Sequence, residues 1–188
     1  MQIPLLTTRF NNDTWQENYV YRERNGIKGC IYGSATQIKC SIPINALVFI
    51  IEMNNSTNHI EGVSLVRNFA HFDKYYKIYS SGTYNRYTYK SEYRIETNHL
   101  DSKIVEILEN ICFKEKSHLK RGIGFTAIPE KLKRNAELIG INIEKSIKEE
   151  FHKRFEKVEI SNVFEDFQDN RNNRSNKKKK KHKLVIID

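Results

Sequence analysis

Two apolar runs with a polar turn between them dominate the first half of this chain. The run at residues 46–53 is rich in Val, Ile and Phe, and a second run follows at residues 59–66. A run that is so short and so apolar favours a strand buried on both faces. Residues 54–58, Asn-Asn-Ser-Thr-Asn, consist of turn-forming types. The segment therefore predicts a β-hairpin, with Gly62 marking a bulge in its second strand.

Shorter strands are predicted on either side of this hairpin. Residues 29–32 and 36–40 form one candidate pair, joined by a turn at Gly33 and Ser34. Residues 74–78 and 86–95 form another pair. In the last of these segments tyrosines alternate with Thr, Lys and Arg, which predicts a strand with two different faces.

The second half of the chain has helical periodicity. Asp101 is a good N-cap, and apolar residues follow it at helical spacing up to Ile111. Pro129 suits the first turn of a helix over residues 130–139. An i, i+4 ladder of Ile and Phe predicts a last helix from Ile143 to Phe155.

Strands followed by helices indicate an α+β fold. We expect one globular domain over residues 1–168, which is β-rich over 1–98 and helical over 99–160. The expected architecture is a small, mostly antiparallel β-barrel or curved sheet with two or three packed helices. Residues 169–188 are expected to form a disordered basic tail.

Positive charge is concentrated in that tail. The chain carries 32 Lys and Arg against 23 Asp and Glu, a formal net charge of +9, and residues 171–183 contain eight of the cations and no acid. Such a segment cannot bury enough apolar surface to fold. It predicts a partner that is a polyanion, with Lys177, Lys178, Lys179, Lys180 and Lys181 as contacts, or a nuclear-import receptor.

The tyrosine-rich segment at residues 75–94 is the strongest candidate site in the body of the chain. Aromatic rings stack on bases, and neighbouring cations contact phosphates. The alternative is that the tyrosines are strand formers with their rings in the core. The nucleic-acid-binding candidates from this segment are Tyr84, Arg86, Tyr87, Tyr89, Lys90 and Arg94.

A second candidate is the basic connector before a Gly-x-Gly pair. Lys116, Lys120 and Arg121 precede Gly122 and Gly124, and glycines allow a phosphate to approach the backbone closely. The pattern is neither a P-loop nor a dinucleotide-binding fingerprint, because the required residues around the glycines are absent. A solvated basic loop is the alternative.

Catalytic and metal-binding patterns are absent from the sequence. The six histidines and three cysteines have no metal-ligand spacing, so we expect no metal and no cofactor. The odd cysteine count and the absence of an export signal predict an intracellular protein with reduced thiols, in cytoplasm or nucleus. No apolar run reaches the length of a membrane span. Glu52, inside an apolar strand, could lie at a barrel edge, anchor an arginine or act in catalysis.

The arrangement of residues 10–95 resembles the PUA-like β-barrels, the group that includes EVE, ASCH and YTH domains. The resemblance is carried by Trp15 in a polar loop, Gly-Cys-Ile-Tyr-Gly at 29–33, the apolar strand at 47–53 and the return strand at 60–65. It implies binding of RNA, or of a modified base in an aromatic pocket. Trp15, Tyr32 and the 84–93 strand are its pocket candidates. The long helical C-terminal third departs from a minimal barrel.

The composition also resembles proteins of giant DNA viruses. The resulting hypothesis is a non-catalytic nucleic-acid-binding protein, with RNA favoured over DNA and no membrane partner. One alternative is a virion or interaction protein whose tail packages with the genome or directs nuclear import. Another is a nucleic-acid-processing enzyme built on Glu52, the histidines and Lys116.

Overall fold

The computed structural model describes residues 3–114, 119–138 and 140–155, without the side chains of 135–138. Contacts along the chain divide it into two compact units, residues 1–151 and 152–188. Both sheets belong to the first unit. The predicted boundary between domain and tail, after residue 168, lies outside the described residues.

The first unit is built on an open five-stranded sheet with the strand order β6-β4-β3-β1-β7. In chain order its strands are β1 (Leu5–Phe10), β3 (Leu47–Asn54), β4 (His59–Arg67), β6 (Arg94–Glu96) and β7 (Thr126–Ala127). β1 runs parallel to β3, and the other pairings are antiparallel. β2 (Cys30–Ser34) and β5 (Tyr87–Ser91) pair separately as an antiparallel ribbon. The α+β class is confirmed. Of the two predicted forms, a β-barrel or a curved sheet, the barrel is not found, because neither sheet is closed.

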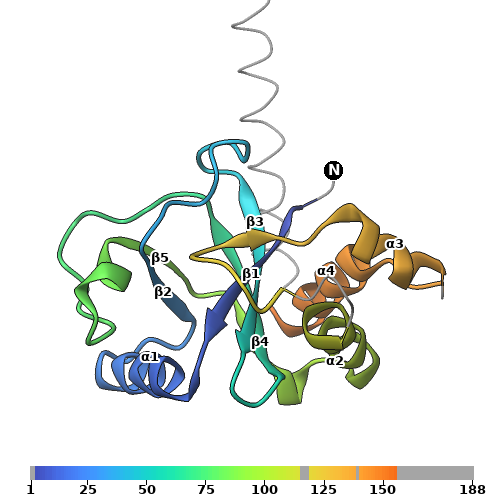
Figure 1. Ribbon diagram of the computed structural model, residues 1–188, viewed down its shortest axis with the longest axis horizontal. Helices are drawn as coiled ribbons and strands as arrows, with labels where there is room; N and C mark the ends of the chain where they lie inside the picture. Colours follow the sequence, from blue (N-terminus) through green and yellow to red (C-terminus); the bar gives the residue numbers. More distant parts are fainter. Residues whose placement is uncertain (1–2, 115–118, 139, 156–188) are drawn as a thin grey trace, which may run out of the picture. The chain divides into compact units, whose positions relative to one another are not determined.

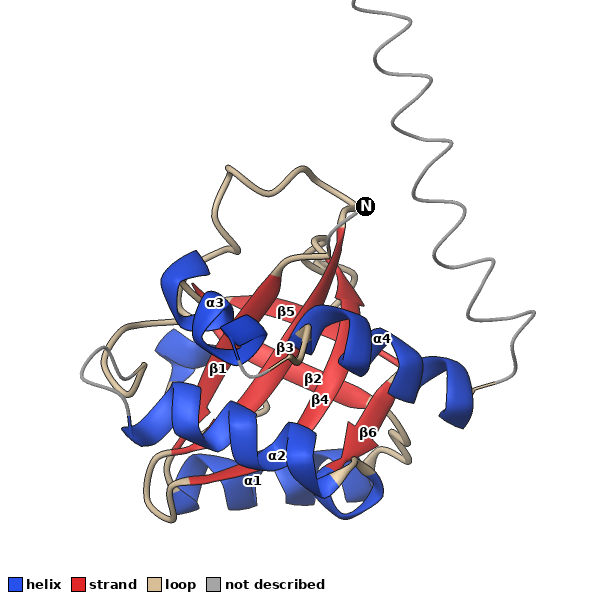
Figure 2. Ribbon diagram, turned by 90° about the vertical axis from the view of Figure 1, so that its right-hand side faces the viewer, coloured by secondary structure: helices blue, strands red, loops and turns tan. Residues whose placement is uncertain are grey.

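Helices and the ribbon cover the two faces of this sheet, giving three layers. The helices are α1 (Asn12–Arg24), α2 (Ser102–Glu109), α3 (Glu130–Leu138) and α4 (Ile143–Arg154). In Figure 1, α2, α3 and α4 lie on one side of the sheet, and α1 lies with β2 and β5 on the other. Figure 2 shows the same order of layers from the side of α2–α4.

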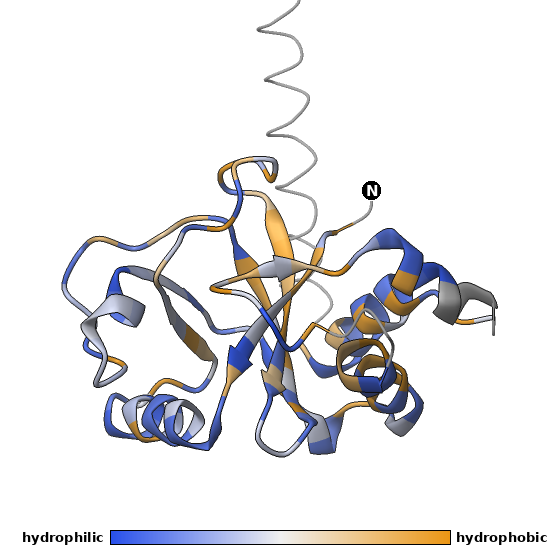
Figure 3. Cartoon of the chain, viewed as in Figure 1, coloured by the Kyte–Doolittle hydropathy of each residue, from blue (hydrophilic) through white to orange (hydrophobic). Residues whose placement is uncertain are grey.

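The sheet is buried on both faces at β3, as the apolar run predicts. All eight residues of β3 are buried. Val48 and Ile50 belong to the core cluster shared with the ribbon, whereas the Phe49 ring packs on Phe151 of α4 with centroids 5.3 Å apart. Figure 3 shows the hydrophobic colour concentrated along this central strand. The predicted hairpin of β3 and β4 is confirmed, and its bulge lies beside Gly62.

Three helices also form where the sequence predicts them. The Asp101 carboxylate caps α2 by accepting a hydrogen bond from the backbone N–H of Lys103 at 2.8 Å. α3 follows Pro129, and α4 begins at Ile143. The fourth helix, α1, was not predicted, and it lies between β1 and β2, so the order of strands first and helices afterwards is wrong. Its buried residues are the polar Asn18 and Arg22, which give no apolar stripe to detect.

Two predicted strands do not form, and side chains accept hydrogen bonds from backbone groups in and next to these segments. At 36–40, the Tyr89 hydroxyl accepts the N–H of Ile38 at 3.0 Å. At 74–78, the Asn85 side-chain oxygen accepts the N–H groups of Ile78 and Tyr79, at 3.0 and 2.9 Å. The predicted strand at 86–95 is split, since β5 pairs with β2 and β6 pairs with β4.

Among the described helices, none has the length and apolar character needed to cross a lipid bilayer.

Candidate nucleic-acid interface

Two of the predicted stacking residues, Tyr32 and Tyr89, lie in the core. Each is only 1% exposed. The Tyr32 hydroxyl lies 2.6 Å from Glu52 Oε1 and 2.7 Å from Ser64 Oγ, and burial raises the pKa of Tyr32 well above its usual value. The Tyr89 ring packs edge-on against Phe125 at 5.1 Å. Neither ring presents a face to a base, so the prediction that both bind nucleic acid is corrected: they are core residues, as the strand-former alternative expects.

The Arg94 side chain is also buried, so it is not accessible to a ligand in solution. Its side chain is 3% exposed and pairs with the Glu52 carboxylate, itself 2% exposed. Burial acts to lower the pKa of Arg94, but the adjacent carboxylate and its hydrogen bonds raise it overall. This corrects the prediction that Arg94 contacts phosphates. For Glu52, the expectation that it anchors an arginine is confirmed.

Trp15 lies on α1 rather than in a loop. Its partly buried ring meets Phe10 edge-on at 5.2 Å. The guanidinium groups of Arg22 and Arg94 lie 5.6 and 5.8 Å from the ring centroid. Trp15 therefore packs between two cations at the end of the core, and it does not line the pocket that contains Tyr84.

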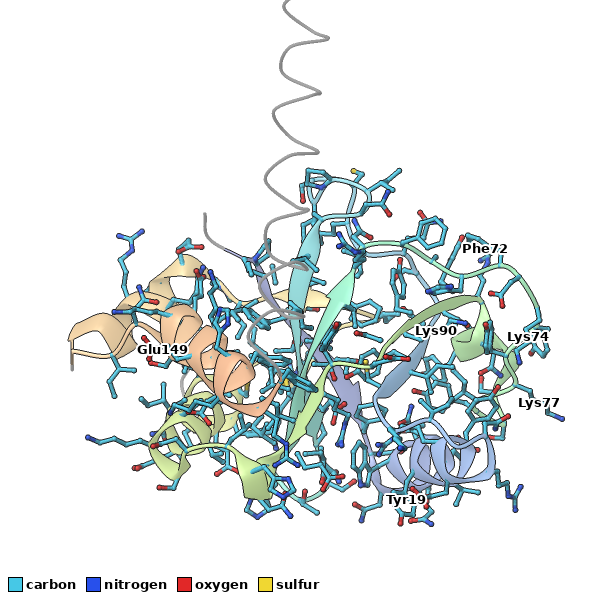
Figure 4. The ribbon with its side chains drawn as sticks, turned by 180° about the vertical axis from the view of Figure 1, so that it is seen from behind. Tyr19, Phe72, Lys74, Lys77, Lys90 and Glu149 are labelled. Atoms are coloured by element: carbon cyan, nitrogen blue, oxygen red, sulfur yellow. The ribbon has the colours of Figure 1, made fainter. Side chains whose placement is uncertain are left out.

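A solvent-exposed aromatic and basic surface lies in and around the loop from β4 to β5. Phe69, Phe72 and Tyr75 are 49%, 68% and 66% exposed. We call this region the aromatic–basic surface. It consists of Phe69, Phe72, Lys74, Tyr75, Lys77, Arg86, Tyr87 and Lys90. In Figure 4, Phe72, Lys74, Lys77 and Lys90 lie on one side of the molecule and Glu149 lies on the other.

Contacts within the aromatic–basic surface hold its rings and cations in place. The Phe72 ring meets Tyr87 edge-on at 6.2 Å, and Arg86 lies over Tyr87 at 5.8 Å. The ammonium groups of Lys74 and Lys90 both lie 5.1 Å from the buried Tyr76 ring. The cations are thus held over the buried Tyr76 ring and the partly buried Tyr87 ring, in the same segment as the exposed rings, and proteins that bind single-stranded nucleic acid combine cations with aromatic rings.

The charge of the aromatic–basic surface is almost entirely positive. Asp73 is the single acid between residues 68 and 91. Its pKa is lowered, chiefly by a hydrogen bond from the Tyr76 hydroxyl. A hydrogen bond to that same hydroxyl raises the pKa of Lys90, which stays charged. Desolvation, together with the charge of Lys90, lowers the pKa of His71, so its imidazole is neutral at pH 7.

The sequence predicts only part of this surface. Arg86, Tyr87 and Lys90 were among its candidates, and the structure brings them together. Phe69 and Phe72 were missed, because they lie outside any periodic segment. The available signal was the short spacing of aromatic residues before Lys74, in a stretch with one acid.

The other predicted residues lie elsewhere. Tyr84 and Lys120 line one pocket of about 260 Å³, beside the Gly122–Gly124 turn. Arg121 is exposed next to Lys120. Lys116 and Lys177–Lys181 lie outside the described residues, so their predicted roles stay predictions.

The described part of the chain contains no group of three or more His, Cys, Asp or Glu side chains placed to hold a metal ion. No protein-family model matches the chain. A search of curated proteins finds no similar sequence. The resemblance to PUA-like domains therefore stays a prediction.

Proposed function

We propose that this protein is a non-catalytic nucleic-acid-binding protein whose aromatic–basic surface binds single strands. The observation that supports it best is the exposure of Phe72 and Tyr75, at 68% and 66%, in a region with four cations and one acid. Exposed apolar rings that are grouped in one region, unlike single exposed rings, are typical of interaction sites. A base stacked on such a ring contributes ~1–3 kcal/mol, whatever its identity.

The ligand we propose is RNA in preference to DNA. That preference follows from the PUA-like resemblance rather than from the surface, since rings and cations accept both. The tail cations at 171–183 would add affinity that depends on salt and not on sequence.

Alanine substitutions on the full-length protein test the stacking contribution. Phe72→Ala and Tyr75→Ala should each weaken binding of a labelled single-stranded 12-mer by ~1–3 kcal/mol, measured by fluorescence anisotropy. Their thermal unfolding should change little, because both rings are exposed. Tyr19→Ala is the matched control, since Tyr19 is 45% exposed on α1 and outside this surface. Equal losses for Tyr75→Ala and Tyr19→Ala would contradict the proposal.

Charge variants test the same surface independently. Lys77→Ala should reduce the slope of log K against log salt by about 0.7, the value for one phosphate contact on a single strand. Lys145→Ala on α4 removes an exposed lysine from the opposite side of the sheet and should leave the slope unchanged. Running both on RNA and DNA strands of one sequence measures the preference between them.

A further inference from the structure

A pocket separate from the aromatic–basic surface opens where β1 passes into α1. Its walls come from the end of β1, the start of α1, the end of β2 and the turn at Gly122–Gly124. Its volume is about 260 Å³, close to the lower end of the ~300–1,000 Å³ typical of small-molecule sites. The lining residues include two cations, Arg9 and Lys120, and no Asp or Glu.

Arg9 is a partly buried cation without a carboxylate partner among the described residues. Its Nη1 donates a hydrogen bond to the carbonyl of Gly124 at 3.1 Å, and its Nε donates to the carbonyl of Leu119. Its Nη2 is buried and has no hydrogen-bond partner in the described structure. Desolvation lowers the pKa of Arg9. A desolvated guanidinium with an unused donor is unfavourable by itself, and an anion would compensate it.

The turn opposite Arg9 needs its glycines. Gly124 has a φ of 65°, and a Cβ there would lie 2.6 Å from Thr36 Oγ1 and 2.8 Å from Ser34 Oγ. Gly122 has a φ of 130°, and its Cβ would come within 3.3 Å of Arg9 Nη2. Both conformations lie where only glycine is comfortable. The glycines therefore let the turn pack closely on Ser34, Thr36 and Arg9, and both glycines line the pocket.

The rest of the wall is suited to a nucleoside. The Tyr84 ring, 44% exposed, lines the pocket and lies nearly perpendicular to the Tyr79 ring, at a centroid distance of 6.3 Å. Thr8 and Thr14 add hydroxyl groups to the lining. The Lys120 ammonium group lies over the Phe113 ring, 5.8 Å from its centroid. An exposed ring in a pocket that is lined by two cations suits a base attached to a phosphate.

We infer that this pocket binds a phosphomonoester carried by a nucleoside, with Arg9 and Lys120 facing the phosphate and Tyr84 facing the base. Two sources share this chemistry: a free mononucleotide and the phosphorylated end of a strand. The second source rests on the proposed function, and the first does not.

Calorimetric titrations of the full-length protein at physiological salt test the inference. Uridine 5′-monophosphate should bind at one site, and uridine should bind at least tenfold more weakly. Lys120→Ala should weaken the nucleotide by about tenfold, the effect of losing one charge-assisted contact. Arg121→Ala removes the neighbouring exposed cation that does not line the pocket, and it should stay within twofold. Arg9→Gln should behave like Lys120→Ala; if it unfolds, Lys120→Ala decides.

Oligonucleotides with a 5′-phosphate, a 3′-phosphate or hydroxyl ends separate the two sources. Tighter binding of one phosphorylated end, lost in Lys120→Ala, assigns the pocket to strand ends; binding of the mononucleotide alone assigns it to free nucleotides. The inference is overturned by equal affinity for uridine and its monophosphate, by equal losses in Arg121→Ala and Lys120→Ala, or by no binding at millimolar nucleotide. Phe72→Ala should leave mononucleotide binding intact. A result against strand binding at the aromatic–basic surface can therefore be distinguished from a result against nucleotide binding in the pocket.

Discussion

Arg94 donates to both carboxylate oxygens of Glu52, with Nε 2.9 Å from Oε1 and Nη2 2.8 Å from Oε2. The pair lies between the five-stranded sheet and the β2–β5 ribbon, where the Tyr32 hydroxyl also reaches Glu52. Gly62 leaves room for it, since a Cβ there would lie 3.0 Å from Glu52 Oε2 and 3.1 Å from Arg94 Nη2. The pair thus joins β3 and β6, and through Tyr32 it also contacts the ribbon.

Removing the Arg94 side chain should therefore lower the free energy of unfolding, without a direct effect on nucleic-acid binding. Arg94→Ala leaves the Glu52 charge buried and unpaired, which typically costs about 3–5 kcal/mol of unfolding free energy. Urea unfolding measures the loss, and Arg86→Ala, an exposed arginine eight residues earlier, is the control with an expected change within about 0.5 kcal/mol. A stable Arg94→Ala protein with weakened strand binding would return Arg94 to the binding surface.

The sequence predicts those parts of the fold that depend on residues close together in the chain. The hairpin of β3 and β4, the bulge beside Gly62 and the cap at Asp101 all follow from residue types within a few positions. The pairing of β1 with β3 does not, because it joins Leu5 to Phe49 across the chain. Likewise, alternation indicated that Tyr87 and Tyr89 share a face, and both contact one core cluster. It could not indicate that this face packs on the core, with Tyr89 buried and Tyr87 partly exposed at the margin.

Part of the pocket at Gly122–Gly124 and part of the aromatic–basic surface could be predicted from the sequence. The Gly-x-Gly pair and Lys120 were identified together, and both line the pocket. Arg9, which completes it, is 111 residues away in the sequence from Lys120, and tertiary contacts, among them the β1–β7 pairing, bring the two regions together. Phe69 and Phe72 were missed because exposure of a ring depends on tertiary packing, which no periodic pattern records.

The three cysteines should differ sharply in reactivity. Burial raises the pKa of Cys30 to about 11 and that of Cys112 to about 12, whereas Cys40 is exposed. Because the thiolate is the reactive form, Ellman's reagent at pH 8 should modify one thiol per native chain and three in urea. Cys40→Ala should abolish the native reaction. Rapid modification of two or more thiols in the folded protein would contradict the buried placement.

Stability should fall in alkaline solution for the same reason. The folded protein holds the protons of Cys30 and Cys112 more tightly than the unfolded chain, whose thiols titrate near the reference value of 9.0. Stability from these groups is therefore complete below about pH 9 and is lost as pH rises toward 11. Unfolding free energy should drop by on the order of 1–2 kcal/mol per pH unit above about 9.5. Cys112→Ala should make the decline shallower, and an unchanged slope would remove this thiol as a cause.

Deleting residues 170–188 should separate salt-dependent affinity from stacking. The deleted segment carries the eight cations of residues 171–183, and each phosphate contact on a single strand contributes about 0.7 to the slope of log K against log salt. The truncated protein should therefore lose several units of slope, while Tyr75→Ala should still weaken its remaining binding by ~1–3 kcal/mol. Its thermal unfolding should match that of the full chain. If the truncated protein binds no strand at all and Tyr75→Ala has no effect in either form, the tail alone binds nucleic acid and the folded unit serves another purpose.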